Sequence, residues 1–145
     1  MGYYDLASGA KTVQAAPAVV RTGHITGATI DTKGCDSLYC VVNMGTFIGD
    51  GTSALKLEHS DASNMSDVED ITGATFTAMS TSLHEGVQVG RLNLTGAKRY
   101  VRCYGTHGGS GTHATVVGVV FIMGTSNSAE ATAADFNLVS IPTTD

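Results

Sequence analysis

The fold is decided by D-T-K-G-C-D-S-L-Y-C-V-V-N-M-G at residues 31–45, L-K-L-E-H-S-D-A-S-N-M-S-D at 55–67 and V-G-R-L-N-L-T-G-A-K-R-Y-V-R at 89–102. Each block reads as a β-strand with a turn attached, because apolar and β-branched residues give way to Gly, Asn and Asp. None of the three blocks carries a recognisable catalytic constellation. They predict a β-sandwich whose role is binding and packing.

Further strands are indicated by apolar alternation outside these blocks. Residues 54–59 and 87–94 alternate in this way, and residues 115–123 are almost continuously apolar, as in a strand at the centre of a sheet or buried on both faces. About seven or eight short strands predict an all-β fold, a single jelly-roll-like β-sandwich. The predicted core consists of Val41, Leu55, Leu57, Val89, Leu92, Val101, Val117, Val119 and Phe121.

The length of 145 residues predicts one domain. We expect the sandwich to span residues 18–124, between an N-terminal arm at 1–17 and a C-terminal arm at 125–145, because both ends are polar and aperiodic. Residues 128–135 are the only helical candidate. The Gly-Asp-Gly at 49–51 predicts a hairpin turn, since Asp-Gly is a strong hairpin signal.

The composition excludes several classes of partner. Only 14% of the residues are charged and the net charge is -5, which argues against a nucleic-acid surface. The longest apolar run is too short to span a bilayer, and the first ten residues lack the basic and apolar regions of a signal peptide, so we expect no membrane partner and synthesis in a cytoplasm. The odd count of cysteines, Cys35, Cys40 and Cys103, predicts reduced thiols in or near the core.

Residue types suited to metal binding or catalysis are present without the required spacing. The five histidines show no H-E-x-x-H pattern, and no cysteine pair has C-x-x-C spacing. They are His24, His59, His84, His107 and His113. His107 and His113 flank a Gly-rich loop that lacks the Lys of a phosphate-binding loop, and we expect them to be exposed loop residues. The sequence predicts no enzymatic activity, cofactor or metal site.

Two charged segments allow a functional interpretation. The acidic loop at 61–70 has oxygen ligands suited to calcium but lacks the glycine and the final glutamate of an EF-hand, so we favour a solvated hairpin loop. Lys98, Arg99 and Arg102 are either a solvated strand edge or a salt-bridging contact with an acidic partner.

The three blocks quoted above, in this order over residues 24–123, resemble small virion proteins encoded in the head or structural modules of tailed phages. The match rests on strand and turn residues. They are Asp31, Gly34, Asp36, Ser37, Asn43, Ser60, Asp61, Asp67, Gly90, Lys98, Arg99, Tyr100, Val101 and Arg102. The resemblance implies a β-sandwich that decorates or cements the outside of a capsid and bridges subunits of the major capsid protein. The low charge and the apolar run at 116–123, more apolar surface than one small sandwich easily hides, predict a homo-oligomer, and the resemblance implies that it is a trimer. The resemblance implies no catalytic residues.

We expect the two arms to make the contact with the shell, since isolated apolar anchors on a polar segment are typical of chains that order on a partner. The candidate partner-binding residues are Tyr3, Tyr4, Leu6, Phe136, Leu138, Val139 and Ile141. The alternative is a tail- or fibre-associated β-sandwich that recognises glycan or another virion protein. The absence of Trp and the few aromatic residues disfavour this alternative.

Overall fold

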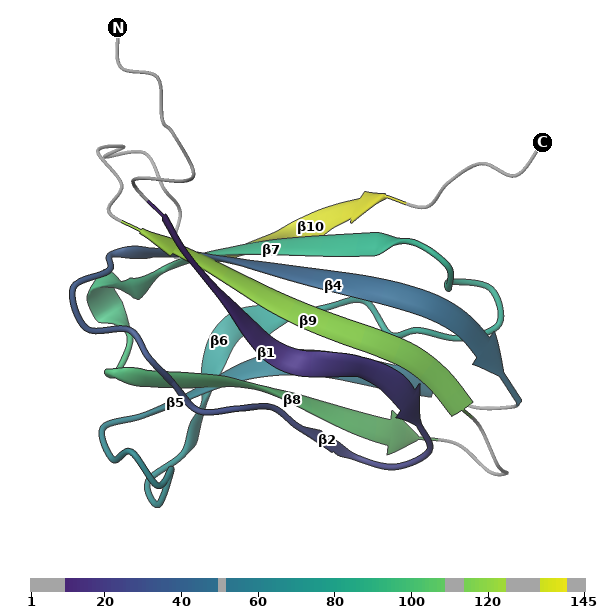
Figure 1. Cartoon of the computed structure of the whole chain (residues 1–145), viewed down its shortest axis with the longest axis horizontal. Coiled ribbons are helices and arrows are strands. Elements are labelled where there is room, and N and C mark those ends of the chain that lie inside the picture. The colour runs from purple at the N-terminus through teal and green to yellow at the C-terminus, as the bar shows by residue number, and fades with distance from the viewer. Residues whose placement is uncertain (1–9, 50–51, 109–113, 125–133, 141–145) are drawn as a thin grey trace, which may run out of the picture.

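The chain folds into two antiparallel β-sheets that pack face to face, as Figure 1 shows. This computed structural model describes residues 10–49, 52–108, 114–124 and 134–140. The predicted β-sandwich is confirmed.

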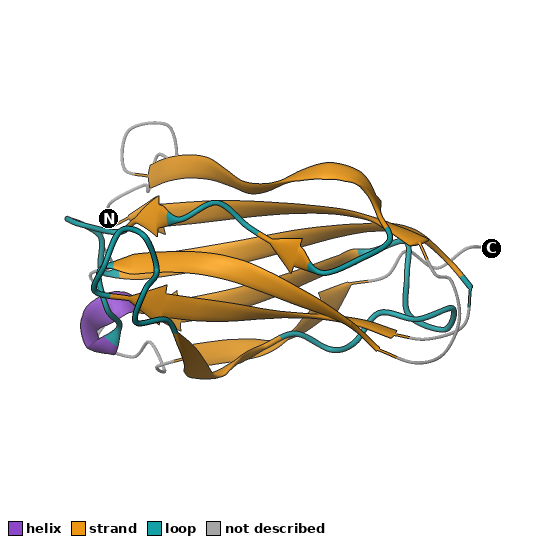
Figure 2. Ribbon diagram, turned by 90° about the horizontal axis from the view of Figure 1, so that it is seen from below, coloured by secondary structure: helices purple, strands orange, loops and turns teal. Residues whose placement is uncertain are grey.

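Each sheet has five strands. In spatial order, sheet A contains β1 (Ala10–Arg21), β9 (Ala114–Gly124), β4 (Ser37–Ile48), β7 (Val87–Asn93) and β10 (Ala134–Ser140). Sheet B contains β2 (Ile25–Thr26), β8 (Tyr100–Gly108), β5 (Thr52–Ser60) and β6 (Glu69–Thr75), and β3 (Ile30–Asp31) also pairs with β8. The 3₁₀ turn η1 (Leu94–Gly96), purple in Figure 2, is the one helical element in the described part of the chain, where no helix is long and apolar enough to cross a membrane.

The strands pair as nested hairpins, which is the topology of a jelly roll. The innermost pair is β5 with β6, followed outward by β4 with β7, by β2 and β3 with β8, and by β1 with β9. Successive pairs lie alternately in sheet B and sheet A. The jelly-roll order is therefore one long hairpin rolled into two layers, with β10 added to sheet A beside β7.

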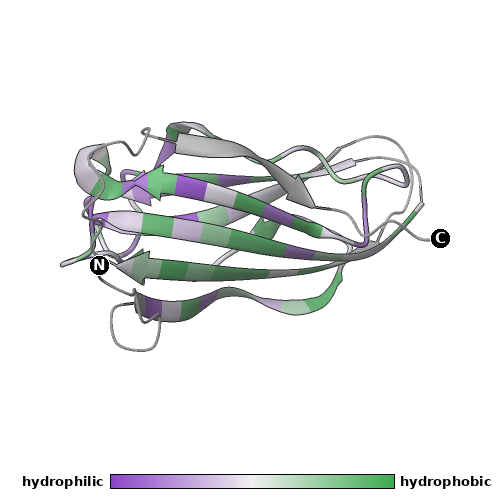
Figure 3. Ribbon diagram, turned by 90° about the horizontal axis from the view of Figure 1, so that it is seen from above, coloured by the Kyte–Doolittle hydropathy of each residue, from purple (hydrophilic) through white to green (hydrophobic). Residues whose placement is uncertain are grey.

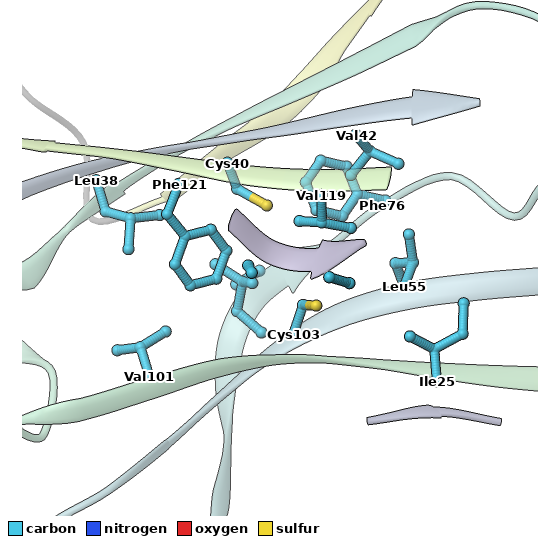
Figure 4. Close-up of a cluster of buried hydrophobic side chains, with 14 of the residues drawn as sticks. Ile25, Leu38, Cys40, Val42, Leu55, Phe76, Val101, Cys103, Val119 and Phe121 are labelled. Atoms are coloured by element: carbon cyan, nitrogen blue, oxygen red, sulfur yellow. The ribbon is translucent and has the colours of Figure 1, made fainter. Parts of the chain in front are cut away.

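The core lies between the sheets, where Leu38, Cys40 and Phe121 of sheet A face Val101 and Cys103 of sheet B (Figure 4). Burying a side chain of this size contributes about 1.5–3 kcal/mol. Seven of the nine predicted core residues are buried.

The core prediction is wrong for Val41 and Val89. Both are only half-buried, because they alternate with inward-facing neighbours and point out of sheet A. Both are β-branched and apolar, so their type fits a core position, and only the register of the strands places them on the outer face.

The expected arm boundaries also change. Residues 10–17 belong to β1 and pair with β9, and residues 134–140 form β10 and pair with β7. The last two residues of the helical candidate, Ala134 and Asp135, lie in this strand, and its other residues lie outside the described chain. Backbone pairing at the sheet edge explains why polar, aperiodic sequence forms a strand at these positions.

The hairpin expected at residues 49–51 is wrong. The strands on either side, β4 and β5, belong to different sheets and pair with other strands. An Asp-Gly turn reverses the chain direction, but the identity of the pairing partner depends on the whole sheet. The hairpin loop of the structure is instead the acidic segment between β5 and β6.

Gln88 is a fully buried polar residue on β7. Its side chain forms hydrogen bonds with the backbone of Thr77, in the segment that follows β6. Its side-chain carbonyl accepts the Thr77 N–H at 3.0 Å, and its amide donates to the Thr77 carbonyl at 2.9 Å. The Gln88 side chain thus takes the place of a neighbouring strand for Thr77, and the N–H and carbonyl of Thr77 both have a hydrogen-bond partner.

Gly27 lies where the segment between β2 and β3 passes between β1 and β8. The Gly27 N–H donates to the Cys103 carbonyl and the Ala28 N–H to the Ala15 carbonyl, both at 2.8 Å. A Cβ at Gly27 would lie 2.5 Å from Cys103 Sγ and 2.9 Å from each of these two carbonyl oxygens. Only glycine allows this close approach of three chain segments.

We therefore predict that Gly27→Ala lowers the free energy of unfolding by about 1–3 kcal/mol, because two of the three clashing atoms belong to the backbone and cannot rotate away. Thermal and urea unfolding measure the effect. Gly23→Ala is the matched control, because a Cβ there meets nothing within 4 Å. Equal stability of the two variants would contradict the close approach of β1 and β8 to the backbone at Gly27.

Candidate binding surfaces

The outer face of sheet A is apolar. One register row joins Ile122 to Tyr39, and the next joins Val120, Val41 and Val89. These five side chains and Val87 point away from the core, and we call them the apolar face. Figure 3 shows the sheet from above, with some strands hydrophobic over most of their length and others in which hydrophobic and hydrophilic residues alternate. Antiparallel sheets usually carry polar residues on an outer face, so this pattern indicates a surface that binds protein.

The apolar face extends to one end of sheet A and has a polar rim. Val20 and Ile48, each 65% exposed, pair with the same end of β9 and continue the apolar surface. Thr12, Gln14, Asn43 and Arg91 lie at other register positions around it, and Asp135 of β10 pairs with Arg91 in the register. An apolar centre with Tyr and Arg and few other charges is typical of protein interfaces.

The outer face of sheet B is charged. Its centre is Glu58, which is buried and accepts a hydrogen bond from Arg102 Nε at 2.9 Å. Lys56 lies 3.5 Å from Glu58 and 2.7 Å from Asp70. The same face carries Tyr104, whose ring centroid is 5.5 Å from Lys56 Nζ. Opposite charges at neighbouring positions compensate one another, so this face is a balanced ionic network.

The basic cluster predicted from sequence is paired within the chain. Arg99 makes a bidentate contact with Asp31 at 2.9 and 2.7 Å, and Lys98 Nζ lies 3.3 Å from Asp67. The Arg99 guanidinium holds the pKa of the Asp31 carboxyl well below its usual range. The sequence left open whether these cations pair with an acidic partner. The structure pairs Lys98 and Arg99 with carboxylates of the same chain, and Arg102 likewise pairs with Glu58.

The acidic loop is organised by one carboxylate. Asp67 accepts hydrogen bonds from the Ser60 hydroxyl and from the Ala62 and Asp61 N–H groups, and it pairs with Lys98. These contacts, with Ser60 first, hold the pKa of Asp67 well below its usual range. The loop joins the adjacent strands β5 and β6, which confirms the hairpin-loop interpretation. Asp67, one of the four acidic residues considered as calcium ligands, already has four protein donors.

An open pocket of about 390 Å³ lies beside this loop. Its lining consists of His59, Glu69, Asp70, Ile71, Thr72, Leu92, Asn93, Gly96 and Ala97. His59 Nδ1 accepts the Lys98 N–H at 3.1 Å, Glu69 lies 3.2 Å from Lys98 Nζ, and Asp70 pairs with Lys56. Three of its polar side chains are therefore already paired within the chain.

The structure separates the histidines considered as metal ligands. Within the described ranges no three His, Cys, Asp or Glu side chains are arranged to hold a metal ion. His24 stacks on Tyr104 with ring centroids 6.2 Å apart, and His84 Nδ1 accepts the Phe47 N–H. His107 was expected in a loop, but it lies in β8, where it pairs with Ser53, because β8 extends to Gly108. His113 and residues 109–112 lie outside the described residues.

The cysteines lie where the sequence predicted. Cys40 and Cys103 are buried, Cys35 is half-buried, and no disulfide joins these three residues, all of which the structure describes. Burial raises the pKa of the Cys40 thiol well above its usual value, and the nearby Cys103 raises it further. A protonated, enclosed thiol behaves as a small apolar side chain.

The predicted partner-binding anchors fall into two groups. Phe136, Leu138 and Val139 are in β10, where the backbone of Leu138 pairs with Val89 and that of Val139 with Gln88. Tyr3, Tyr4, Leu6 and Ile141 lie outside the described residues.

No protein-family model matches this chain, and no curated protein is similar to it at a significant level. The chain is therefore assigned to a fold, the jelly-roll β-sandwich, and to no family.

The sequence indicated excess apolar surface from the run at 116–123 but did not locate it on a face. This run lies in β9, which contributes Val120 and Ile122 to the outer surface of sheet A. A strand that is apolar at both odd and even positions presents apolar side chains on both faces of its sheet.

We predict that Asp67→Asn lowers the melting temperature at neutral pH, and that its difference from the native chain shrinks as the pH falls below about 4. A carboxyl whose pKa is depressed on folding stabilises the protein above the unfolded pKa, near 3.9, and loses that contribution as the pH falls through the folded pKa. Melting curves from pH 7 to pH 2 measure this. Asp61→Asn removes the same charge from the same loop and serves as the control. A difference that stays constant over this range would rule out the proposed role of Asp67.

Proposed function

We propose that this chain is a structural virion protein of a tailed phage, of the cement or decoration type, that binds the outside of the capsid and bridges subunits of the major capsid protein. The observation that carries the proposal is the apolar outer face of sheet A, since a jelly roll with such a face is suited to a protein assembly. The ordered sequence resemblance over residues 24–123 supports the kind of assembly. The role is binding on the capsid surface, without catalysis or a cofactor.

The positions of the described ends are compatible with shell contact by terminal segments. Ala10 pairs with Gly124, so segment 1–9 and the connection 125–133 between β9 and β10 join sheet A at the same end, whereas segment 141–145 follows Ser140, which pairs with Val87 toward the other end of β7. A terminal segment that orders on a partner adds contact area to it. The Asp36 N–H donates to the Gly124 carbonyl at 3.1 Å and fixes this end to the start of β4.

We predict that the chain binds capsid shells assembled without it, and that changing Tyr3, Tyr4 and Leu6 together to Ser weakens binding at least about tenfold. This variant keeps the length of the first segment, and β1 begins beyond it at Ala10. Cosedimentation with shells measures affinity, and electron microscopy of decorated shells locates the protein.

The control variant changes Thr72, Thr75 and Thr77 to Ser, three exposed positions in and after the edge strand β6. Absence of any shell binding by the native chain would refute the proposed function. Equal binding by the anchor variant would instead refute the role of the first segment and leave shell binding to the body of the domain.

The alternative, a glycan-binding module, is favoured by one observation. Tyr104 lies on the outer face of sheet B among Lys56, Arg102 and His24, and sugar sites commonly combine an aromatic ring with charged hydrogen-bonding groups. We expect that Tyr104→Ala leaves shell binding unchanged. Glycan-array binding by the native chain that Tyr104→Ala abolishes would favour the alternative.

A further inference from the structure

We propose that His59 makes a pH-dependent contact at one end of the sandwich: its neutral ring holds the backbone at Lys98, and its protonated ring releases this backbone. The ring belongs to the lining of the open pocket beside the loop between β5 and β6. The inference is independent of the proposed function, because every contact on which it rests lies within one chain.

His59 occupies a core-facing position of β5. It follows Leu55 and Leu57 on the same side of the strand and pairs with the buried Val101 of β8. Its side chain is only 15% exposed, and an enclosed position of this kind disfavours a charge. Histidine is the side chain whose charge ordinarily changes between pH 5 and pH 8. A change of pH in this range therefore alters the charge at the open end of the core.

The hydrogen bond at Nδ1 requires the neutral ring. The Lys98 N–H donates to His59 Nδ1 at 3.1 Å, so the proton of the neutral ring lies on Nε2. A protonated ring carries a proton on each nitrogen and accepts no hydrogen bond. Two N–H groups would then face each other across this distance. The ring and the backbone at Lys98 must therefore separate when the ring is protonated.

Two carboxylates on β6 provide a second position for the protonated ring. Glu69 pairs with His59 in the register, and its Oε2 lies 4.0 Å from His59 Nε2. Asp70 lines the same pocket, and both carboxylates are largely exposed. The pocket has a volume of about 390 Å³ and is open, so the ring has room to turn toward them. Opposite charges favour this position for the protonated ring alone.

Two lysines also face this site. Lys98 Nζ lies 3.2 Å from Glu69 and 3.3 Å from Asp67. Lys56 Nζ lies 2.7 Å from Asp70. The Lys98 ammonium repels the protonated ring, and this repulsion adds to the loss of the hydrogen bond at Nδ1. The other described residues of the pocket lining, on β6, β7 and the turn at η1, carry no ionisable side chain.

The contact lies where three loops meet. Lys98 Nζ reaches Asp67 in the loop between β5 and β6. The next residue, Arg99, accepts the Thr32 N–H with its carbonyl at 3.0 Å and pairs with Asp31 through its side chain. Release of the backbone at Lys98 therefore loosens the link between these loops, while the strand pairs of the two sheets remain in place.

Amide hydrogen exchange of the full chain, measured by NMR from pH 7.5 to pH 5, tests the proposal. The protection factor, which is the intrinsic exchange rate divided by the observed one, corrects for the effect of pH on the exchange reaction. We expect the protection factor of the Lys98 amide to fall at least about fivefold, which corresponds to the loss of one hydrogen bond. The chemical shifts of the His59 ring should report protonation over the same pH range.

The Gly27 amide is the internal control. It donates to the Cys103 carbonyl at 2.8 Å, an acceptor that does not titrate, so its protection factor should stay constant. Two variants separate the His59 ring from other effects of acid. His59→Asn offers an amide oxygen near the position of Nδ1 that accepts without titrating, and should keep the Lys98 amide protected at pH 5. His24→Asn removes an exposed histidine elsewhere and should leave the fall at Lys98 unchanged.

Four results would overturn the proposal. They are a Lys98 protection factor that is the same at pH 7.5 and pH 5, a His59 ring that stays neutral at pH 5, a fall at Lys98 that persists in His59→Asn, and an equal fall at Lys98 and Gly27. The last result would assign the effect of acid to the stability of the whole domain. Circular dichroism and melting curves monitor the fold of each variant.

Discussion

The nested pairing of strands that are distant in sequence is the constraint on which the rest of this molecule depends. β5 pairs with β6, β4 with β7, β3 with β8 and β1 with β9, and each of these pairs lies in the sheet opposite the previous one. This order places the ionic network on the outer surface of sheet B and the apolar face on the outer surface of sheet A. The two surfaces differ because of register, since a shift of one residue would exchange buried and exposed side chains in every strand.

The sequence alone predicted the fold class and most of the core. Its predictions failed where the strands that pair lie far apart along the chain. Leu55 and Leu57 alternate with charged residues, so their burial follows from local pattern. Val41 and Val89 have the same residue type as buried valines, and only their cross-strand partners place them outside. The hairpin predicted at residues 49–51 failed for the same reason, because local turn chemistry does not select the strand that will pair.

The candidate surfaces differ in the same way: some follow from residues close in sequence, and others depend on residues far apart. The role of Asp67 in a hairpin loop follows from nearby residues, since Ser60, Asp61 and Ala62 supply three of its donors. The assignment of Lys98, Arg99 and Arg102 to partners within the chain required the three-dimensional arrangement, because Asp31 and Glu58 are remote in sequence. The apolar face required the register of four strands. An interface on a sheet is a property of several strands together, and no single segment contains it.

The outermost pair, β1 with β9, has a consequence for synthesis. Val13 of β1 pairs with Phe121 of β9, so β1 remains without its partner during synthesis until β9 has emerged from the ribosome. Contacts so distant in sequence are slow to form, and an unpaired strand is prone to associate with other chains before they form. Pro17 and the register shifts around it reduce that hazard, because a strand with a missing N–H and irregular spacing is a poor template for a foreign strand. The irregularity of β1 thus protects the nascent protein during the period in which its fold is incomplete.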